Sequence, residues 1–252
     1  STSVEQAVRL IKDLLDKGHA YWHQGDVFFA PLTFKGFGKL YGLDMSRWPQ
    51  KKVRFYKDTY PGQRWNLGDF ILWHGGKMGD PFVRDSDLGP GRPSWNVQDP
   101  AMISKHLGYE LDICCGGVDN LYRHHDYNIA VLESVSGKTL APYWLHGEHL
   151  LVKGVKMSKS KGNITYPDDL FQKGWSSGFL RFFLLSEHYR TRLDMQADKI
   201  EKAGKKYERL KGLVREIEKG ISCQQEDEQL RASNLAQSLL QGSLVCLCDD
   251  LD

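Results

Sequence analysis

The stretch Leu111–Asp119, which reads LDICCGGVD, decides the fold. Its first five residues, Leu111–Cys115, predict a short buried β-strand, and two glycines and an aspartate follow at once. Glycines at this point let a ligand approach the backbone, and ligands of a parallel sheet bind beyond the carboxyl ends of its strands. The aspartate is placed to accept hydrogen bonds from sugar hydroxyls. An ordinary turn is the more common meaning of such a pattern, and by itself the stretch leaves both interpretations open.

The segments around this stretch predict a doubly wound α/β unit. A helix is expected from His124 to Ser136, ended by Gly137, and a further short strand from Tyr143 to Leu145. Before the stretch, Ala101–Leu107 predicts a helix and Phe70–Trp73 a buried strand. Residues 74–94 hold five glycines and three prolines, which predicts a long loop between them.

A cationic loop follows, and residues 156–163 read KMSKSKGN. With Lys153 there are four lysines in nine residues and no acid among them. Lysine is a point charge on a flexible stem, and serine hydroxyls and backbone amides add hydrogen-bond donors. The segment therefore predicts a mobile loop that closes on a polyanion. A solvated surface loop is the usual meaning of a generic lysine run.

The ends of the chain predict two other parts. Residues 3–17 predict an amphipathic helix and residues 21–29 a β-hairpin. Residues 30–64 are turn-rich and basic, and the basic residues include Arg47, Lys51, Lys52 and Arg54. After the lysine loop, helices are expected at Pro167 and over Phe179–Leu185, then two longer ones over 197–218 and 235–247 that form part of a helical bundle. The basic residues between Arg190 and Lys219 suit either a solvated face or a nucleic-acid backbone.

Composition excludes some classes of protein. The chain has 252 residues and a formal net charge of +2, so charge argues neither for nor against nucleic acid. No apolar stretch reaches the roughly 18 residues of a membrane-spanning helix. The five cysteines form no C-x-x-C pair and are odd in number, which predicts reduced thiols in a cytoplasmic protein. The start without methionine and the end inside a predicted helix suggest a fragment.

Several motifs together resemble the cysteinyl-tRNA synthetase family of class I aminoacyl-tRNA synthetases. They stand in the family's order and spacing over nearly all of the chain: residues 69–73 (DFILW), 89–97 (GPGRPSWNV), 116–119 (GGVD), 124–126 (HHD), 156–160 (KMSKS), 182–185 (FFLL) and 188–190 (HYR). The resemblance implies the second half of a Rossmann-like parallel sheet, with an α+β insertion before it and a helical bundle after it. The implied parts are an insertion module at 1–64, half of a catalytic domain at 65–165, a stem-contact region at 166–195 and the start of an anticodon-side bundle at 196–252.

The resemblance also implies an activity and its residues. An amino acid and ATP would form an aminoacyl-adenylate, and the aminoacyl group would pass to tRNA. Lys156 and Lys159 would hold the ATP phosphates and stabilise the charge that develops on pyrophosphate. The residues implied in nucleotide or amino-acid binding are Ser158 and Ser160 in the lysine loop, Gly116, Gly117 and Asp119 after the strand, and Trp95 in the amino-acid or adenine pocket.

This sequence departs from the family at its zinc site. The family holds zinc through two cysteines, a histidine and a glutamate. Here Asp99 replaces one cysteine, Asn128 replaces the glutamate, and His124 remains, while the other cysteine would lie upstream of this chain. An amide is a weak zinc ligand, so we expect no zinc and no selection of cysteine through a zinc-bound thiolate. The family's His-x-Gly-His loop follows its first strand, which would lie upstream of this chain, and no such loop occurs between Ser1 and Lys156.

Two functions stay open from the sequence. One is ATP-dependent activation of an unidentified amino acid and its transfer to tRNA, which the intact lysine loop favours. The other is a non-catalytic, synthetase-like module that binds tRNA or a protein partner, which the lost zinc ligands favour. The sequence predicts no oligomeric state.

Overall fold

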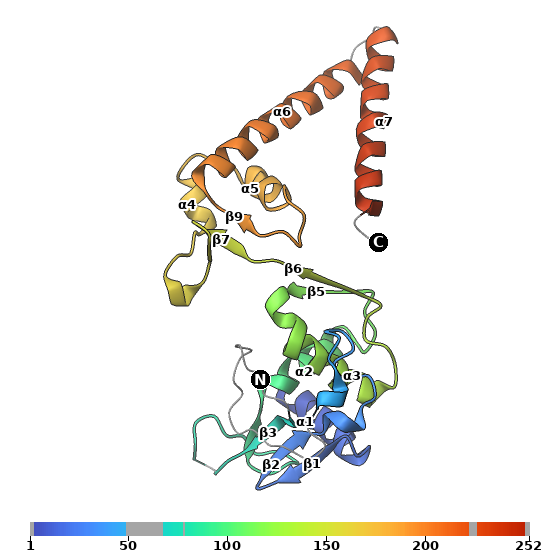
Figure 1. The fold of residues 1–252 in the computed structure, drawn as a ribbon, viewed down its shortest axis with the longest axis vertical. Coiled ribbons are helices and arrows are strands. Elements are labelled where there is room, and N and C mark those ends of the chain that lie inside the picture. Colours follow the sequence, from blue (N-terminus) through green and yellow to red (C-terminus); the bar gives the residue numbers. More distant parts are fainter. Residues whose placement is uncertain (1–2, 49–67, 78, 222–225, 250–252) are drawn as a thin grey trace. The chain divides into compact units, whose positions relative to one another are not determined.

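The computed structural model describes residues 3–48, 68–77, 79–221 and 226–249. The chain divides into two compact units, Ser1–Gly147 and Glu148–Asp252, and both contain helices and strands (Figure 1). The mixed α/β class predicted from the sequence is therefore confirmed. The predicted basic residues Lys51, Lys52 and Arg54 lie outside the described residues.

The first unit contains an antiparallel sheet in the order β1-β2-β3-β4. Its strands are β1 (Ala20–His23), β2 (Asp26–Phe29), β3 (Phe70–Gly75) and β4 (Gly91–Pro93). The predicted hairpin is confirmed, because His23 pairs with Asp26 across a two-residue turn. Both turn residues, Gln24 and Gly25, have positive φ angles of 50° and 87°, as the tightest hairpin turns require.

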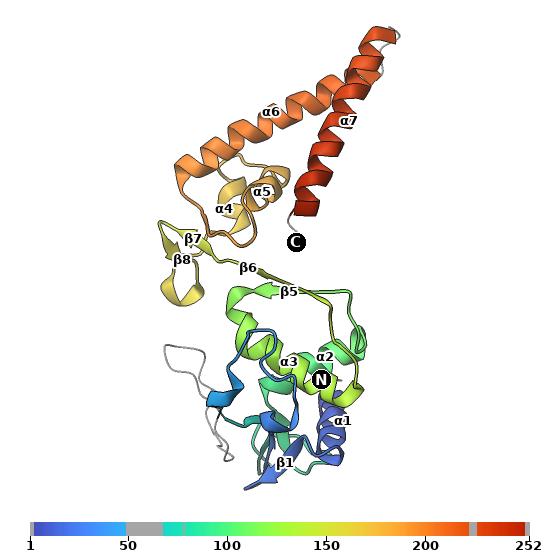
Figure 2. The same ribbon diagram turned by 45° about the vertical axis from the view of Figure 1, so that its right-hand side comes forward.

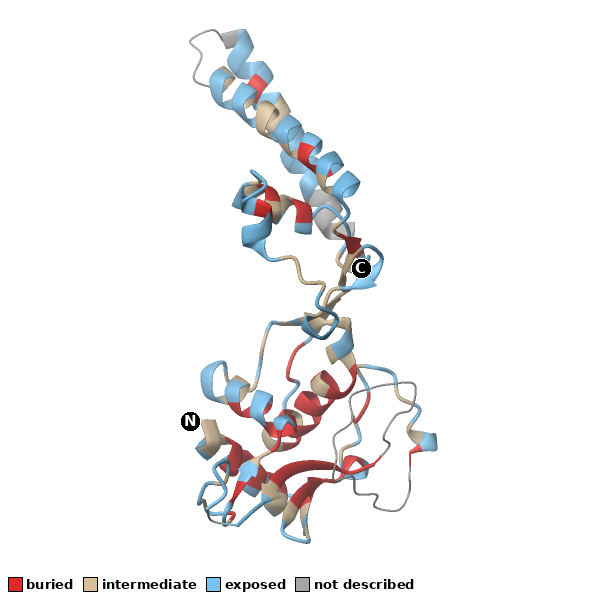
Figure 3. Ribbon diagram, turned by 90° about the vertical axis from the view of Figure 1, so that its left-hand side faces the viewer, coloured by how far each residue is buried: buried red, intermediate tan, exposed pale blue. Residues whose placement is uncertain are grey.

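Three helices pack on one another and on this sheet: α1 (Ser3–Asp16), α2 (Trp95–His106) and α3 (Asp126–Ser136). One core joins them, and its fully buried side chains include Leu10, Ile11 and Leu14 of α1, Phe29 and Leu72 of the sheet, and Ile129 and Leu132 of α3. Figure 3 shows the buried residues gathered in α1, α3 and the strands. Elements from before and after residue 64 share this core, while the four-part domain division stays a prediction.

Helix α2 begins six residues before the predicted start at Ala101. Its N-cap is Ser94, whose hydroxyl accepts a hydrogen bond from the backbone N–H of Asn96 at 3.2 Å. Pro100 lies inside the helix and removes one backbone hydrogen bond, which is why the sequence pattern favoured a later start. The preceding segment is also not one long loop, because strand β4 lies in it.

A parallel strand pair lies beside α3. Strand β5 (Ile113–Gly117) pairs with β6 (Tyr143–Gly147), and α3 connects them. The predicted buried strand Leu111–Cys115 was wrong in its bounds and its burial. Strand β5 starts at Ile113, Gly116 and Gly117 pair with β6 and extend it, and none of its residues is buried. Helix α3 ends at Gly137, in the left-handed conformation, as predicted. The larger Rossmann-like sheet stays a prediction.

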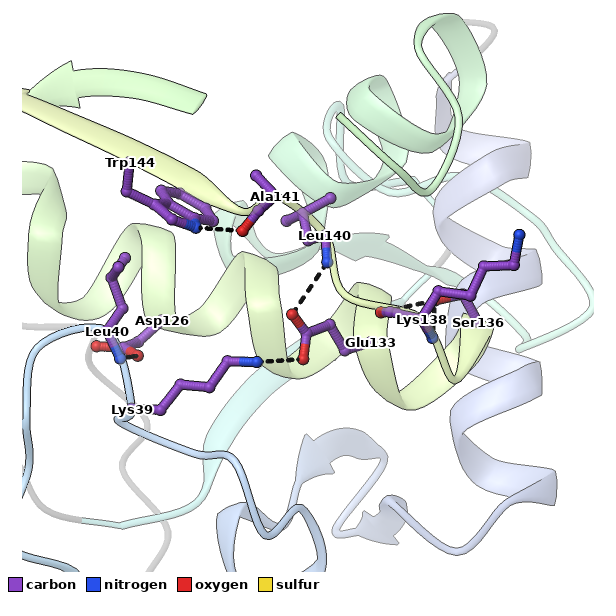
Figure 4. Close-up of polar contacts among 9 residues, drawn as sticks. All are labelled: Lys39, Leu40, Asp126, Glu133, Ser136, Lys138, Leu140, Ala141 and Trp144. Atoms are coloured by element: carbon purple, nitrogen blue, oxygen red, sulfur yellow. Dashed lines mark hydrogen bonds and ion pairs between the residues drawn. The ribbon is translucent and has the colours of Figure 1, made fainter. Parts of the chain in front are cut away.

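Helix α3 starts at Asp126, two residues after the predicted start, and this residue is fully buried. Its carboxylate accepts hydrogen bonds from the backbone N–H groups of Leu40 and Tyr41, each at 3.2 Å. Farther along the helix, Glu133 pairs with Lys39 at 2.6 Å and accepts the backbone N–H of Leu140 at 3.0 Å (Figure 4). Two carboxylates of one helix therefore hold loops on both sides of it.

The second unit has a small sheet in the order β8-β7-β9, formed by β7 (Leu150–Val152), β8 (Val155–Lys156) and β9 (Leu193–Asp194). Helices α4 (Pro167–Phe171) and α5 (Ser177–Leu184) occur where the sequence predicts them. Phe179 and Phe183 of α5 form a core with Leu193 and Ala203. This core is separate from that of the first unit.

Two long helices end the chain, α6 (Ala197–Ile221) and α7 (Glu226–Asp249). They pack against each other as a helical pair (Figure 2). The two predicted helices are confirmed, but a bundle needs further helices and stays a prediction.

In the described part of the chain, no helix combines the length and apolar character needed to cross a membrane.

We predict that Asp126 makes stability depend on pH. Burial raises the pKa of this carboxyl to about 6, above its ordinary value of 3.8, so the folded protein retains the proton more tightly than the unfolded chain. The group's contribution to stability is therefore complete at acid pH and is lost as the pH rises through about 6. Asn cannot titrate. The wild type should therefore lose free energy of unfolding between pH 4 and pH 7, whereas Asp126→Asn should not. Over this range the free energy of unfolding of the variant should rise by on the order of 2 kcal/mol relative to that of the wild type.

Urea unfolding at a series of pH values measures this difference. Asp85→Asn is the control, because Asp85 is an exposed aspartate of the same unit. A stability difference between Asp126→Asn and wild type that does not change with pH would contradict the prediction.

Candidate functional site

The end of β5 brings three of the predicted site residues together. Gly116 and Gly117 are its last residues, and Asp119 follows in a short 3₁₀ helix, Val118–Asn120. A Cβ atom at Gly117 would lie 2.6 Å from Oδ1 of Asp119, so the carboxylate lies directly against the glycine backbone. The Asp119 side chain is exposed. The geometry thus places an exposed carboxylate at the carboxyl end of a parallel strand, where ligands of such sheets bind.

Gly116 is required by a buried histidine. A Cβ atom there would lie 2.6 Å from Cε1 and 3.0 Å from Nε2 of His125, closer than van der Waals contact permits. Nδ1 of His125 lies 2.7 Å from Nε2 of His146 on β6, which is hydrogen-bond distance. Burial, together with the neighbouring His146, lowers the pKa of His125 to about 4. Burial also lowers the pKa of His146. The short contact is therefore a hydrogen bond between the two rings.

Trp95 lies at the first position of α2 and is half exposed. Its ring packs edge-on against His124, with ring centroids 5.4 Å apart. The Ser94 hydroxyl and the Asn96 amide both donate to the carbonyl of Ile71, at 2.6 and 2.8 Å. These two contacts join the start of α2 to β3 and so fix the backbone that carries Trp95.

The lysine loop belongs to the second unit and begins in the β7–β8 hairpin. Lys156 is the last residue of β8, and Lys159–Lys161 form a short 3₁₀ helix that ends at Gly162 in the left-handed conformation. All four lysines of the loop are exposed. Lys153, Lys159 and Lys161 form no ion pair with any residue of the described part of the chain. The loop therefore presents several cationic side chains to solvent.

Asn163 fixes the backbone of this loop. Its side-chain oxygen accepts the backbone N–H of Ser158 at 2.8 Å, and its Nδ2 donates to the carbonyl of Lys156 at 3.1 Å. The hydroxyls of Ser158 and Ser160 lie 3.3 Å apart. One side chain thus closes the loop around both serines and the second lysine.

The residues at the family's zinc positions do not fit the metal. They supply one imidazole from His124, one carboxylate from Asp99 and one amide from Asn128, where zinc prefers thiolate and imidazole ligands. Asn128 is buried on α3, whereas Asp99 is exposed on α2. No group of three His, Cys, Asp or Glu side chains that could hold a metal occurs among the described residues. A zinc-free site stays a prediction.

The predicted site residues thus form two clusters, one in each unit. Gly116, Gly117 and Asp119 lie at one strand end, with Trp95 against His124 in the same unit. Lys156, Ser158, Lys159 and Ser160 lie in one loop. The sequence interpretation gave no role to Asn163 or to the His125–His146 contact. For Asn163 the local signal was its place directly after Gly162, because asparagine side chains often form hydrogen bonds with nearby backbone groups.

Comparison with known proteins shows the family of the chain. Residues 1–205 match the family described as "tRNA synthetases class I (C) catalytic domain". The chain therefore belongs to this family of class I tRNA synthetase catalytic domains.

Curated relatives carry the name cysteine–tRNA ligase. That of Sulfurihydrogenibium sp. is 38% identical over 86% of this chain, and that of Persephonella marina is 39% identical over the same share. The ligase of Prochlorococcus marinus is 42% identical over 77% of this chain. The chain spans 44%, 44% and 39% of these relatives, respectively, which is less than half of their length.

We predict that Gly116→Ala destabilises the first unit. The new Cβ displaces the His125 ring and breaks its contact with His146, so the free energy of unfolding should fall by about 1–3 kcal/mol. Thermal or urea unfolding measures the change.

Gly212→Ala in α6 is the matched control, because nothing lies within 4 Å of a Cβ atom at that position. It should raise stability by at most about 1 kcal/mol, since alanine favours a helix over glycine. If both variants had the same stability, the steric role of Gly116 would be wrong.

Proposed function

We propose that this chain is part of an enzyme that activates an amino acid with ATP and transfers it to tRNA. The observation that carries the proposal is the lysine loop: its backbone is fixed by Asn163, and its lysines are exposed. An array of exposed ammonium groups with a defined backbone suits the phosphates of ATP. The family to which the chain belongs supports the same reaction.

In the proposed reaction, the amino-acid carboxylate attacks the α-phosphorus of ATP, and pyrophosphate leaves. Lys156 and Lys159 act as the catalytic cations, because negative charge develops on the leaving pyrophosphate and cations already in place stabilise it. Ser158 and Ser160 contribute hydroxyl donors from the same loop. Asp119 accepts hydrogen bonds from the ribose, and the backbone of Gly116 and Gly117 approaches the nucleotide at the end of β5. Trp95 lines the amino-acid or adenine pocket.

Several finer assignments belong to this proposal. The protein acts in the cytoplasm and in protein biosynthesis, with tRNA as its macromolecular partner. The four parts that the resemblance implies, an insertion module at 1–64, half of a catalytic domain at 65–165, a stem-contact region at 166–195 and the start of a bundle at 196–252, belong to the same proposal. The amino acid is selected without zinc, because His124, Asp99 and Asn128 are a poor ligand set.

We predict that Lys159→Ala in the complete gene product abolishes most amino-acid-dependent ATP–pyrophosphate exchange. Loss of one preorganised cation should lower the exchange rate about 100-fold, with folding unaffected because the side chain is exposed. Lys173→Ala, which removes another exposed lysine of the same unit, should keep wild-type exchange. If no amino acid supported ATP–pyrophosphate exchange by the wild-type protein, the proposed function would be refuted.

We also predict that the exchange reaction does not depend on zinc. With an aspartate at position 99 and an amide at position 128, the ligand set should hold the metal weakly, so the purified protein should contain far less than one zinc per chain by elemental analysis. Treatment with 1,10-phenanthroline should leave the exchange rate unchanged. Stoichiometric zinc, or activity lost to the chelator and restored by zinc, would show that the ligand argument is wrong.

The second candidate function is a non-catalytic module that binds tRNA or a protein partner. The altered zinc positions favour it, because loss of the metal removes a known means of selecting the amino acid. Calorimetry with tRNA and with ATP separates the two functions. Tight tRNA binding without ATP binding would favour the module over the enzyme.

A further inference from the structure

The lysine loop begins at one tight turn. Strands β7 and β8 pair with Val152 opposite Val155, and Lys153 and Gly154 form the two-residue turn between them. Both residues have positive φ angles, 52° and 76°. Because Lys156 follows Gly154 by only two residues, the conformation of this turn sets the direction in which the lysine loop leaves the sheet.

A carboxylate from a distant part of the chain holds this turn. Oδ2 of Asp194 accepts the backbone N–H of Gly154 at 2.7 Å and the side-chain N–H of Gln196 at 2.7 Å. Asp194 is only 5% exposed, although its side chain is polar. Its other oxygen, Oδ1, is buried and has no hydrogen-bond partner in the described part of the chain. Burial of a carboxylate is unfavourable, and its hydrogen bond to Gly154 offsets part of that cost. Hydrophobic packing alone would not require an aspartate at this position.

The strand that carries Asp194 is itself held firmly. β9 pairs with β7 in parallel, with Asp194 opposite Leu151, and the backbone N–H of Met195 donates to the carbonyl of Leu151 at 2.8 Å. The neighbouring Leu193 is buried in the core with Phe179 and Phe183. Strand pairing and the buried Leu193 thus fix the position of Asp194, and its hydrogen bond to Gly154 fixes the turn before the lysine loop.

We infer that Asp194 is a positioning residue for the reaction of the lysine loop. Its carboxylate fixes the Gly154 amide, and through this two-residue turn it sets where Lys156 and Lys159 meet the phosphates. Asp194 itself touches no reactant. The inference rests on the proposed function, because it assigns the contact a role in binding the ATP phosphates.

Asp194→Ala in the complete gene product tests the inference. Loss of a hydrogen bond to a charged group should lower kcat for ATP–pyrophosphate exchange about tenfold or more, with KM for the amino acid unchanged. Hydrogen–deuterium exchange should become faster in peptides that span residues 153–163. Asp194→Asn keeps one oxygen that can accept the Gly154 N–H, so it should retain kcat within about threefold of wild type.

Asp169→Ala is the matched control. Asp169 is an exposed aspartate of the same unit that also accepts a backbone N–H, from Tyr166 at 2.8 Å, but it lies outside the small sheet. This variant should lose some stability and keep kcat.

The outcomes separate the inference from the proposed function. If the wild type is active and Asp194→Ala has the same kcat as Asp169→Ala, the inference is overturned and the proposed function is not. Unchanged deuterium exchange over residues 153–163 in Asp194→Ala also overturns it, even if kcat falls. A wild-type protein without exchange activity overturns the proposed function, and this inference with it.

Discussion

The first unit depends on the buried carboxylate of Asp126 at the start of α3. Two backbone N–H groups of one loop donate to it, and without them a fully buried charge would be strongly unfavourable. Helix α3 also connects the two parallel strands and contributes much of the core. Any shift of α3 would therefore move His124 and His125, and through them the surroundings of Trp95 and Gly116.

Polar side chains also hold a loop in the second unit. The lysines of this loop repel one another and are exposed, so apolar packing of these side chains does not fix its conformation. Asn163 and Asp194 supply hydrogen bonds to its backbone instead, from within the loop and from β9. These contacts leave the lysine side chains exposed. Such an arrangement suits a loop whose task is to bind a strongly charged ligand, because order in the backbone lowers the entropy lost on binding.

How much the sequence predicts depends on the range of the interaction. The β1–β2 hairpin, the end of α3 at Gly137 and the helices α4 to α7 follow from turn residues and periodicity a few positions apart, and these predictions are confirmed. The start of α2 and the end of β5 were placed wrongly. In the first case a proline masked the helix, and in the second two glycines suggested a turn where pairing with β6 continues the strand. Asp194 had no local signal at all, because its partner Gly154 lies 40 residues away in the sequence.

The difference between short-range and long-range interactions also applies to the candidate site. The lysine loop could be predicted because its chemistry is contained in one short segment. The pocket that the resemblance implies has no such local pattern, because Trp95, Asp99, His124 and Asn128 come from two helices and a connecting segment. On the proposed function, phosphate binding by the loop and selection of the amino acid are carried by different units with separate cores. Substitutions at Asp99 and Asn128 then alter selection while Asn163 and Asp194 still hold the lysines. On this proposal, a change at the zinc positions leaves the phosphate-binding loop intact, because neither Asp99 nor Asn128 lies in that loop.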